Sequence, residues 1–364
     1  MTLWLYFARR FALTVGVVLA VFAGILMLID MVEQIRRYAG SDLSLGQAAQ
    51  LALLNMPGAL YRVLPLVVML GSIALFLALA RSSELVVTRA AGRSALGALV
   101  SPVAAALVLG AVGVALINPL VAATGRASDQ YAAELRRGPQ SVLSISEEGM
   151  WLRQGNPDGQ TVIRAARASR DGTHLFAVTF LAFDEGGLPV TRIEAEEAVL
   201  EPGRWRLAGA KEWHLNEDNP EVSARLYETA ELATNLTVDS IRDSFGTPAA
   251  IPIWDLPEFI AGLERAGFTS QKHRVWLQME LALPVLLAAM VLVAAGFTMR
   301  HVRFGRMGVL VLLAVLSGFA IFFLRNFAQI LGENGQIPPA LAAWSPPVVA
   351  ILFALSLLLH LEEG

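Results

Sequence analysis

Residues 81–93 have the residue types and spacing for a specific protein contact: Arg-Ser-Ser-Glu-Leu-Val-Val-Thr-Arg-Ala-Ala-Gly-Arg. The pattern predicts a short amphipathic helix that ends at Gly92, with Leu85, Thr88 and an alanine pair along one side. Two interpretations stay open on physical grounds. The segment is either a solvated loop whose arginines contact phospholipid headgroups, or a coupling helix that docks on a cytoplasmic ATPase with Glu84 as its charged contact. The docking interpretation uses Arg81, Glu84, Leu85, Thr88, Arg89 and Gly92.

Four arginines at the ends of long apolar runs are candidates for binding an anionic ligand: Arg36, Arg37, Arg62 and Arg325. A guanidinium group suits phosphate because it donates two parallel hydrogen bonds. The four could therefore form a basic rim that holds the phosphates of a lipid. The alternative for each is that its side chain reaches ordinary headgroups or pairs with Asp30, Glu33 or Asp42.

The sequence carries no pattern of a self-sufficient enzyme. Neither of the two lysines, Lys211 and Lys272, follows glycine, which excludes a nucleotide-binding P-loop. The five histidines form no HExxH pair, and there is no Gly-x-Ser-x-Gly elbow. The absence of cysteine excludes disulfides, thiolate catalysis and cysteine-ligated metals. A catalytic set assembled from distant residues stays open. We expect no metal site and no cofactor in this chain, with any ATP and Mg²⁺ bound by a partner.

The elements that must position these residues are membrane helices. Hydrophobic residues make up 55% of the chain and charged residues 16%, with a mean hydropathy of +0.56, whereas roughly a quarter of an ordinary soluble domain is charged. Crossing the hydrocarbon core takes about 20 apolar residues. Six runs approach or reach this length, the last being the shortest: residues 11–29, 61–80, 96–117, 275–297, 307–327 and 346–360. We predict an α-helical polytopic membrane protein with six transmembrane helices.

Arginine positions predict the orientation of these helices. With the N-terminus in the cytoplasm, the inner loops hold Arg9, Arg10, Arg81, Arg89, Arg93, Arg300, Arg303 and Arg306. Residues 332–345, on the outer side, hold neither lysine nor arginine. We therefore expect a multi-pass protein of the bacterial inner membrane with both termini cytoplasmic. Asp30, Glu280 and Arg325 are expected near the outer ends of their helices, so no ion-coupled pathway through the midplane is predicted. The energy for any transport must then come from another chain.

A different kind of sequence separates the third and fourth helices. Residues 125–274 mix acidic and basic side chains, and turn signals such as Pro-Asp-Gly and Gly-Gly recur between runs of partly alternating polarity. This predicts an inserted all-β domain, a sandwich or jellyroll of roughly 100 residues, on the periplasmic side. The predicted domains are 1–124 with the coupling helix at about 81–93, 125–274, and 275–364.

Bulky side chains in the predicted strands are expected to line the interior of the β-domain: Phe176, Val178, Phe180, Trp205, Leu207 and Trp213. One possibility is an apolar interior that opens at one edge to accept acyl chains. The other is an ordinary closed core.

Three segments resemble the LptF/LptG (YjgP/YjgQ) permease family of the lipopolysaccharide exporter. Residues 81–92 are similar to the family pattern of a glutamate followed by leucine, a basic residue, alanine and glycine. Asp-Met-Val-Glu-Gln-Ile-Arg-Arg at 30–37 and Ile-Pro-Pro-Ala-Leu-Ala-Ala-Trp-Ser-Pro at 337–346 agree, and both are closer to the LptG branch than to the LptF branch. With the layout of three helices, a β-domain and three helices, the resemblance covers the whole chain.

The resemblance implies a permease subunit of an ATP-driven exporter that extracts lipopolysaccharide from the inner membrane and passes it to a periplasmic bridge. It implies an LptF-type permease, an LptB-type ATPase dimer, and LptC- and LptA-type periplasmic proteins as partners, and a periplasmic β-jellyroll. It also places the first, second and fifth helices around the lipid, so the four arginines would hold the lipid A phosphates.

Two other functions remain alternatives. The chain could be a membrane-anchored scaffold whose β-domain binds a periplasmic protein, although one or two helices would suffice for that. It could also be the permease of another lipid or lipoprotein exporter, for which family analogy suggests four helices. Co-purification of an ATPase separates the scaffold from both permeases.

Overall fold

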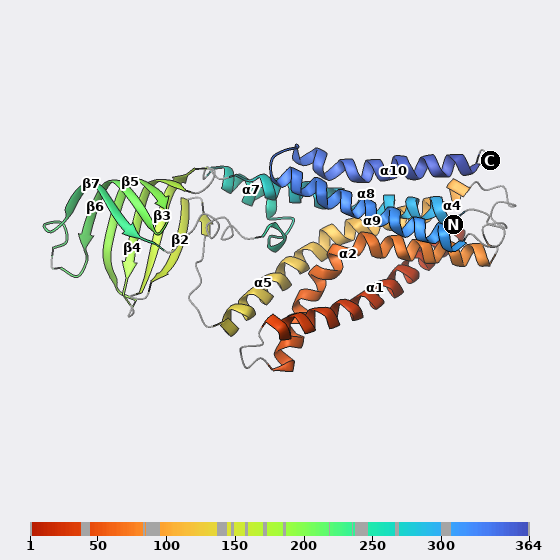
Figure 1. Cartoon of the computed structure of the whole chain (residues 1–364), viewed down its shortest axis with the longest axis horizontal. Helices are drawn as coiled ribbons and strands as arrows, with labels where there is room; N and C mark the ends of the chain where they lie inside the picture. The colour runs from red at the N-terminus through yellow and green to blue at the C-terminus, as the bar shows by residue number, and fades with distance from the viewer. Residues whose placement is uncertain are drawn as a thin grey trace. The chain divides into compact units, whose positions relative to one another are not determined.

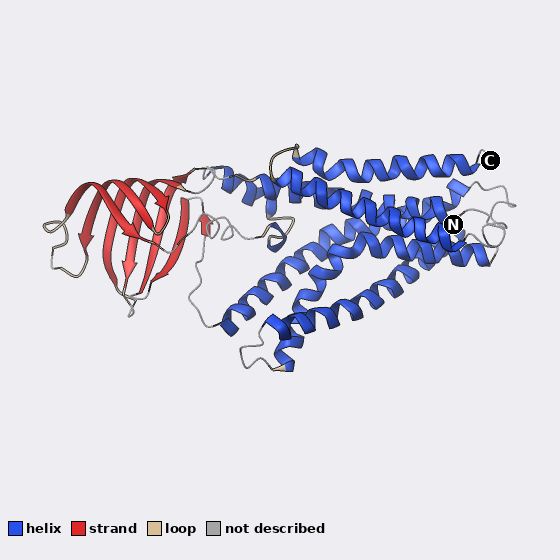
Figure 2. Cartoon of the chain, viewed as in Figure 1, coloured by secondary structure: helices blue, strands red, loops and turns tan. Residues whose placement is uncertain are grey.

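The computed structural model describes residues 2–37, 44–82, 84, 95–136, 144–146, 149–156, 159–169, 173–184, 187–217, 219–234, 236, 247–265, 269–299 and 307–362. The chain divides into two compact units. The helical unit contains residues 1–131, 249–254 and 271–364, and the β-unit contains residues 132–248 and 255–270 (Figure 1, Figure 2).

Six helices in the described residues are long and apolar enough to cross a membrane. They are α1 (Thr2–Arg37), α2 (Leu45–Arg81), the continuous helix of α4 (Ala95–Val112), η1 (Gly113–Ile117) and α5 (Asn118–Arg136), α8 (Gln271–Thr298), α9 (Met307–Glu333) and α10 (Pro339–Glu362). The predicted polytopic fold is confirmed.

The helices are longer than the apolar runs that identified them. The third was expected to end at residue 117, but it continues through the π-helical turn η1 to Arg136. The sixth begins at Pro339 instead of residue 346, at a position where proline loses no hydrogen bond. At the start of α2, Gln47 N–H donates to Ser44 Oγ at 3.2 Å and Ser44 N–H to Gln47 Oε1 at 2.9 Å, which forms a capping box.

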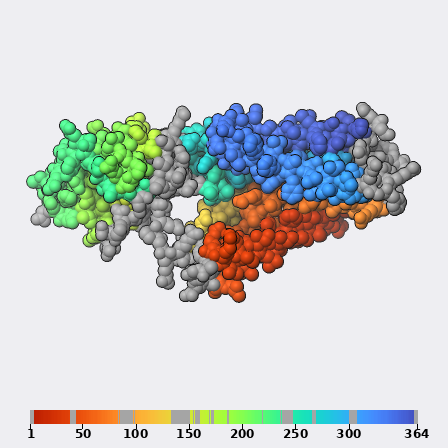
Figure 3. All heavy atoms as spheres, in the orientation of Figure 1, coloured from red at the N-terminus to blue at the C-terminus, as the bar shows by residue number. Residues whose placement is uncertain are grey.

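α2 and α8 form the centre of the helical unit. In their most apolar windows 67% and 72% of residues are buried, against 6% for α1 and 17% for α9. Small residues allow the close helix contacts. Gly110 of α4 faces Pro284 of α8, where an added Cβ would overlap the proline backbone, and Gly71 of α2 lies against Val15 of α1. Figure 3 shows α1, in red, at the surface of this unit.

The β-unit is a single antiparallel sheet of seven strands in chain order. The strands are β1 (Ser144–Ser146), β2 (Gly149–Asn156), β3 (Gly159–Ala168), β4 (His174–Phe183), β5 (Pro189–Glu201), β6 (Arg204–His214) and β7 (Arg225–Ala233). The predicted all-β insertion is confirmed. Its strands pair in one sheet instead of the two facing sheets of a sandwich, because each strand pairs with the next one along the chain.

This sheet curves strongly enough to enclose its own core (Figure 1). The register places Phe180 of β4 opposite Ile193 of β5, and Ile193 opposite Glu212 of β6. A flat sheet would therefore hold Phe180 and Trp205 roughly 25 Å apart. Their ring centroids are instead 6.1 Å apart. One curved sheet thus provides both walls of the core.

The alternation of inward and outward side chains changes phase in the middle strands. Ala177 of β4 and Gly209 of β6 have positive φ angles, 52° and 59°. On β6 the inward residues are Leu207 on one side of Gly209 and Ala210 on the other, three positions apart instead of two. A left-handed residue therefore reverses which side chains face the core.

This phase change corrects two of the six predicted interior residues. Val178, Phe180, Trp205 and Leu207 are buried in the core. Phe176 instead lies beside Arg167, whose Cζ is 5.7 Å from its ring centroid, and Trp213 lies beside Arg192 at 5.5 Å. Both rings are on the outer face, because strict alternation fails at Ala177 and Gly209.

The helix α7 (Leu256–Arg265) completes the β-unit, and η2 (Pro248–Ala250) precedes it. Leu263 of α7 is 1% exposed and belongs to the same core as Trp205. Whether this interior opens to admit acyl chains stays a prediction.

Candidate functional site

The predicted coupling segment is described at its N-terminal end. Arg81 is the last residue of α2 and is exposed, and Ser82 caps the helix with its N–H on the carbonyl of Ala78 at 3.0 Å. Leu85, Thr88, Arg89 and Gly92 lie outside the described residues.

Glu84 uses both carboxylate oxygens in contacts with α1 and Ser82. Arg10 Nη1 donates to Oε1 at 2.6 Å, Ser82 Oγ donates to the same oxygen at 2.7 Å, and Tyr6 OH donates to Oε2 at 3.1 Å. Burial acts to raise the pKa of Glu84, but the hydrogen bonds from Arg10, Ser82 and Tyr6 outweigh it, so the pKa lies below its ordinary value. Glu84 is therefore a bound carboxylate at neutral pH.

The N-terminal part of α1 that holds Glu84 is the part that packs firmly. Phe7, Phe11 and Val15 are buried in the helical core, and Ser101 Oγ of α4 donates to the carbonyl of Trp4 at 2.5 Å. This fixes the Tyr6 and Arg10 side chains relative to α2 and α4.

The four arginines of the predicted rim have different surroundings. Arg36 pairs with Glu33 one turn earlier at 2.8 Å, and its side chain is 78% exposed. Arg37 and Arg62 are exposed and make no ion pair with any described residue. Arg325 interacts electrostatically with Glu280 and Tyr61 inside the helical unit. The side chains of Arg37 and Arg62 are thus accessible, whereas the charge of Arg325 has an internal partner, and the rim itself stays a prediction.

A buried polar cluster near Arg325 joins four helical segments. Glu280 of α8 is 2% exposed and accepts a hydrogen bond from Tyr61 OH of α2. The side chain of Asn118, at the start of α5, lies beside both groups, and Arg325 of α9 supplies the opposite charge. Glu280 lies about 14 Å from the first residue of α8, at 1.5 Å per residue. This is farther from the helix end than the predicted run from residue 275 suggested, because α8 begins at Gln271.

Sequence reasoning missed Tyr61 and Asn118 as partners in this cluster. Asn118 directly follows η1, which leaves backbone groups without their usual helical partners. Trp254 Nε1 donates to the carbonyl of Ala115 at 3.2 Å, and Ile253 N–H donates to Asn118 Oδ1 at 2.9 Å. The sequence did signal this site through Glu280, an acidic residue inside an apolar run. Its partners could not be predicted because they come from helices that are distant in sequence.

A second polar cluster ties α1 to the rest of the unit at its other end. Asn55 of α2 donates to Asp30 of α1 at 3.1 Å and accepts from Ser128 of α5 at 2.7 Å, and Gln34 also donates to Asp30 at 3.3 Å. Asp30 is therefore already paired within the bundle, and Arg36 has Glu33 as its carboxylate partner.

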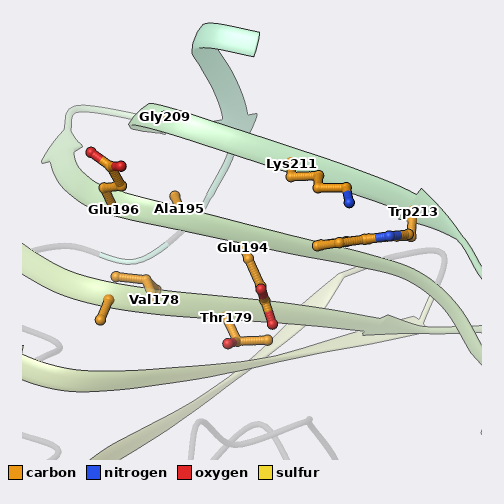
Figure 4. Close-up of a pocket in the computed structure, with 9 residues that line it drawn as sticks. Val178, Thr179, Glu194, Ala195, Glu196, Gly209, Lys211 and Trp213 are labelled. Atoms are coloured by element: carbon orange, nitrogen blue, oxygen red, sulfur yellow. The ribbon is translucent and has the colours of Figure 1, made fainter. Parts of the chain in front are cut away.

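The outer face of the sheet carries a shallow cavity of about 450 Å³ where the phase change occurs (Figure 4). Its charged and aromatic lining residues, Glu194, Glu196, Lys211 and Trp213, come from β5 and β6. Lys211 Nζ lies 4.7 Å from the centroid of the Trp213 ring and donates to Glu221 at 2.5 Å.

Glu221 completes this outer-face cluster. It accepts a second hydrogen bond from Trp213 Nε1 at 2.7 Å. The hydrogen bond from Lys211, which has the larger effect, and the one from Trp213 lower the pKa of Glu221. In the part of the chain that the structure describes, no three His, Asp or Glu side chains gather to hold a metal ion.

Comparisons with known proteins cover both units. A family model described as "Lipopolysaccharide export system permease LptF/LptG" matches residues 5–360. The chain is 26% identical to the lipopolysaccharide export system permease protein LptG of Escherichia coli strain K12 over 360 residues, which are 98% of this chain and 97% of the relative. It is 25% identical to the LptG protein of Haemophilus influenzae over 361 residues, 97% of this chain and 96% of the relative.

Proposed function

Because the chain belongs to the LptF/LptG family and is an LptG-like permease of the lipopolysaccharide export system, we propose that it extracts lipopolysaccharide from the inner membrane and passes it to a periplasmic bridge. The observation that carries this proposal is the family match over residues 5–360, which includes the membrane helices and the inserted sheet. A transport path needs several helices, and this multi-pass protein has six candidates among its described residues.

The energy is proposed to come from a partner. No P-loop lysine exists in the sequence, so ATP and Mg²⁺ would be bound by an LptB-type ATPase dimer on which residues 81–93 dock. An LptF-type permease would complete the membrane complex, and LptC- and LptA-type proteins would receive the lipid. Arginine placement favours cytoplasmic termini and a periplasmic β-domain.

The lipid phosphates are proposed to contact Arg36, Arg37 and Arg62. Arg37 and Arg62 are exposed and have no ion-pair partner among the described residues, and the exposed Arg36 can exchange Glu33 for a phosphate. Arg325 is left out of this rim because its charge is directed to Glu280 and Tyr61.

Purification of the tagged chain from membranes with its co-expressed partners tests the proposal. We expect an ATPase to co-purify, and proteoliposomes holding the complex to release lipopolysaccharide to a soluble acceptor only with ATP. Lipid release without ATP dependence, or a chain that recovers periplasmic proteins and no ATPase, would support the scaffold function instead.

The rim has its own variants. Arg36→Glu with Arg37→Glu should reduce the lipopolysaccharide that co-purifies while the ATPase is recovered in full, because the lipid phosphates then meet two carboxylates. Arg9→Glu, at the opposite end of α1, is the matched control. Undiminished lipid in the double variant would show that the two arginines have a structural role only.

A further inference from the structure

A tryptophan in the segment between β7 and α7 is exposed and yet firmly held. Residues 249–254 of this segment belong to the helical unit, and Trp254 at their end is 68% exposed, the highest value among the seven tryptophans. Its Nε1 donates to the carbonyl of Ala115 at 3.2 Å. The indole has no other polar group, so the exposed remainder of the ring is an apolar surface.

The third spanning helix provides the attachment because it widens at η1. A π-helical turn changes the pairing of its carbonyl groups, and the carbonyl of Ala115 lies within this turn. The N–H of Ile253 donates to Oδ1 of Asn118, the next residue after η1, at 2.9 Å, and both of these residues are buried. Two hydrogen bonds on adjacent residues therefore fix Trp254 against this helix.

The attachment lies at a definite depth along the bundle. Asn118 is beside the cluster of Tyr61, Glu280 and Arg325. Counted from the arginine-bearing ends of α2, α8 and α9, these three residues lie about 27–30 Å along their helices at 1.5 Å per residue. The hydrocarbon core of a bilayer is about 30 Å thick. The cluster thus marks the opposite boundary of the core, which is the periplasmic one in the proposed orientation.

An exposed apolar strip leads along the third helix to this boundary. It consists of Val108, Val112, Leu116 and Leu120, which recur every four residues and are 63%, 40%, 68% and 53% exposed. Such a strip on a spanning helix is suited to contact acyl chains. Because η1 contains both Leu116 and the acceptor of Trp254, the indole extends this surface at the level where hydrocarbon gives way to headgroups.

We propose that Trp254 binds the surface of the membrane, with its ring among the headgroups and first methylene groups of the outer leaflet. Tryptophan favours this level in membrane proteins. In water the same ring would expose its apolar surface without compensation. The indole then anchors residues 249–254 to the lipid as well as to the third helix. This interaction does not depend on which molecule the protein transports.

The first test measures the depth of residue 254 in the purified complex in proteoliposomes. The chain has no cysteine, so Trp254→Cys gives it a single site for a nitroxide label. Collisions of the label with oxygen report hydrocarbon, and collisions with a water-soluble nickel complex report water. Leu316→Cys on α9 is the lipid reference, and Leu188→Cys in the β-unit is the water reference, since both leucines are exposed. The wild-type complex is the labelling blank.

We expect the label at residue 254 to lie between the two references, at headgroup depth. Accessibility equal to that of either reference would overturn the proposal. A label that neither reagent reaches would also overturn it, because a protein chain would then cover this surface in place of lipid.

The second test asks whether the indole ring makes the contact. Asp255→Cys, at the exposed position next to Trp254, carries the label while the tryptophan is retained. Trp254→Ala should then raise the nickel accessibility of the label severalfold, whereas Trp254→Phe, which keeps an apolar ring, should change it little. Trp4→Ala, which removes an exposed tryptophan of α1, is the matched control and should have no effect. Unchanged accessibility in Trp254→Ala, or equal increases in the alanine and phenylalanine variants, would show that the ring is not the anchor.

Discussion

The helical unit and the β-unit each place a carboxylate among hydrogen-bond donors, but in opposite environments. Glu280 is 2% exposed and faces Tyr61, Asn118 and Arg325 among apolar side chains. Glu221 is exposed and faces Lys211 and Trp213 on the outer face of the sheet. Each carboxylate thus has one cationic side chain and at least one neutral hydrogen-bond donor beside it.

The difference teaches which of these contacts holds the fold. A buried charge that loses its partner cannot turn to water, so removal of one member costs far more than the pair contributes. An exposed pair exchanges its partner for water at little cost. The buried cluster should therefore control the helical unit, whereas the outer-face cluster should only adjust the local surface.

The largest effect is expected from Glu280→Ala. Loss of the carboxylate leaves the buried Tyr61 hydroxyl without its acceptor and removes the opposite charge near Arg325, at a combined cost of about 3 kcal/mol. Thermal unfolding of the detergent-solubilised chain should show a much lower Tm. Glu33→Gln, which removes an exposed carboxylate from α1, is the control and should have little effect. A Tm for Glu280→Ala that equals the control would show that the cluster is dispensable.

A second variant distinguishes the loss of charge pairing from a general failure to fold. Glu280→Met with Arg325→Met removes both charges and should unfold at a higher temperature than Glu280→Ala, because no unpaired charge remains in the bundle. If the double variant is the less stable one, the charge pairing does not explain the effect.

A smaller effect is expected from Gly110→Ala in α4. The added methyl group would overlap the backbone of Pro284, which cannot turn aside as a side chain can. The cost should be about 1–3 kcal/mol, measured as a loss of Tm in the same assay. Gly24→Ala on α1, where no atom lies within 4 Å of the added Cβ, should be neutral. Equal behaviour of the two variants would contradict the close crossing of α4 and α8.

The phase change in the β-unit should give a still smaller effect. Gly209→Ala places a Cβ at a φ of 59° and 3.1 Å from Glu196, which should cost about 1–2 kcal/mol. Ala177→Gly removes the same backbone penalty and should be neutral or slightly stabilising, since glycine adds about 0.5–1 kcal/mol of unfolded-state entropy. Circular dichroism of the full chain during heating would measure both. Destabilisation of the same size in both variants would argue against left-handed backbone at these positions.

The smallest effect is expected from Glu221→Gln. Because Lys211 and Trp213 lower the pKa of Glu221, its contribution to stability is present above the ordinary pKa of a glutamate and is lost as the pH falls through the lowered folded value. Wild type and variant should differ slightly at neutral pH and converge in acid. A difference that grows on acidification would reverse the sign and refute the assigned pairing.

Much of the architecture could be predicted from the sequence, because local patterns of hydrophobicity identify membrane helices and an inserted domain. Apolar runs identified six helices, although the last run was shorter than a spanning helix, and turn signals located the sheet between the third and fourth. Predictions of which strand residues face the core were partly wrong. Phe176 and Trp213 were assigned inward because alternation was assumed to be strict, and the left-handed Ala177 carries no sequence signal that marks it.

The sequence by itself determined the class of the protein, its family and the absence of a nucleotide-binding loop, since each depends on residue type and near-neighbour spacing. Only the tertiary structure decided that Glu84 is held by Arg10 of α1 and that Glu280 is enclosed by Tyr61, Asn118 and Arg325. The physical reason is that the charge state and energetic role of a charged side chain depend on the groups that replace water around it. In this chain those groups come from helices that are far apart in sequence.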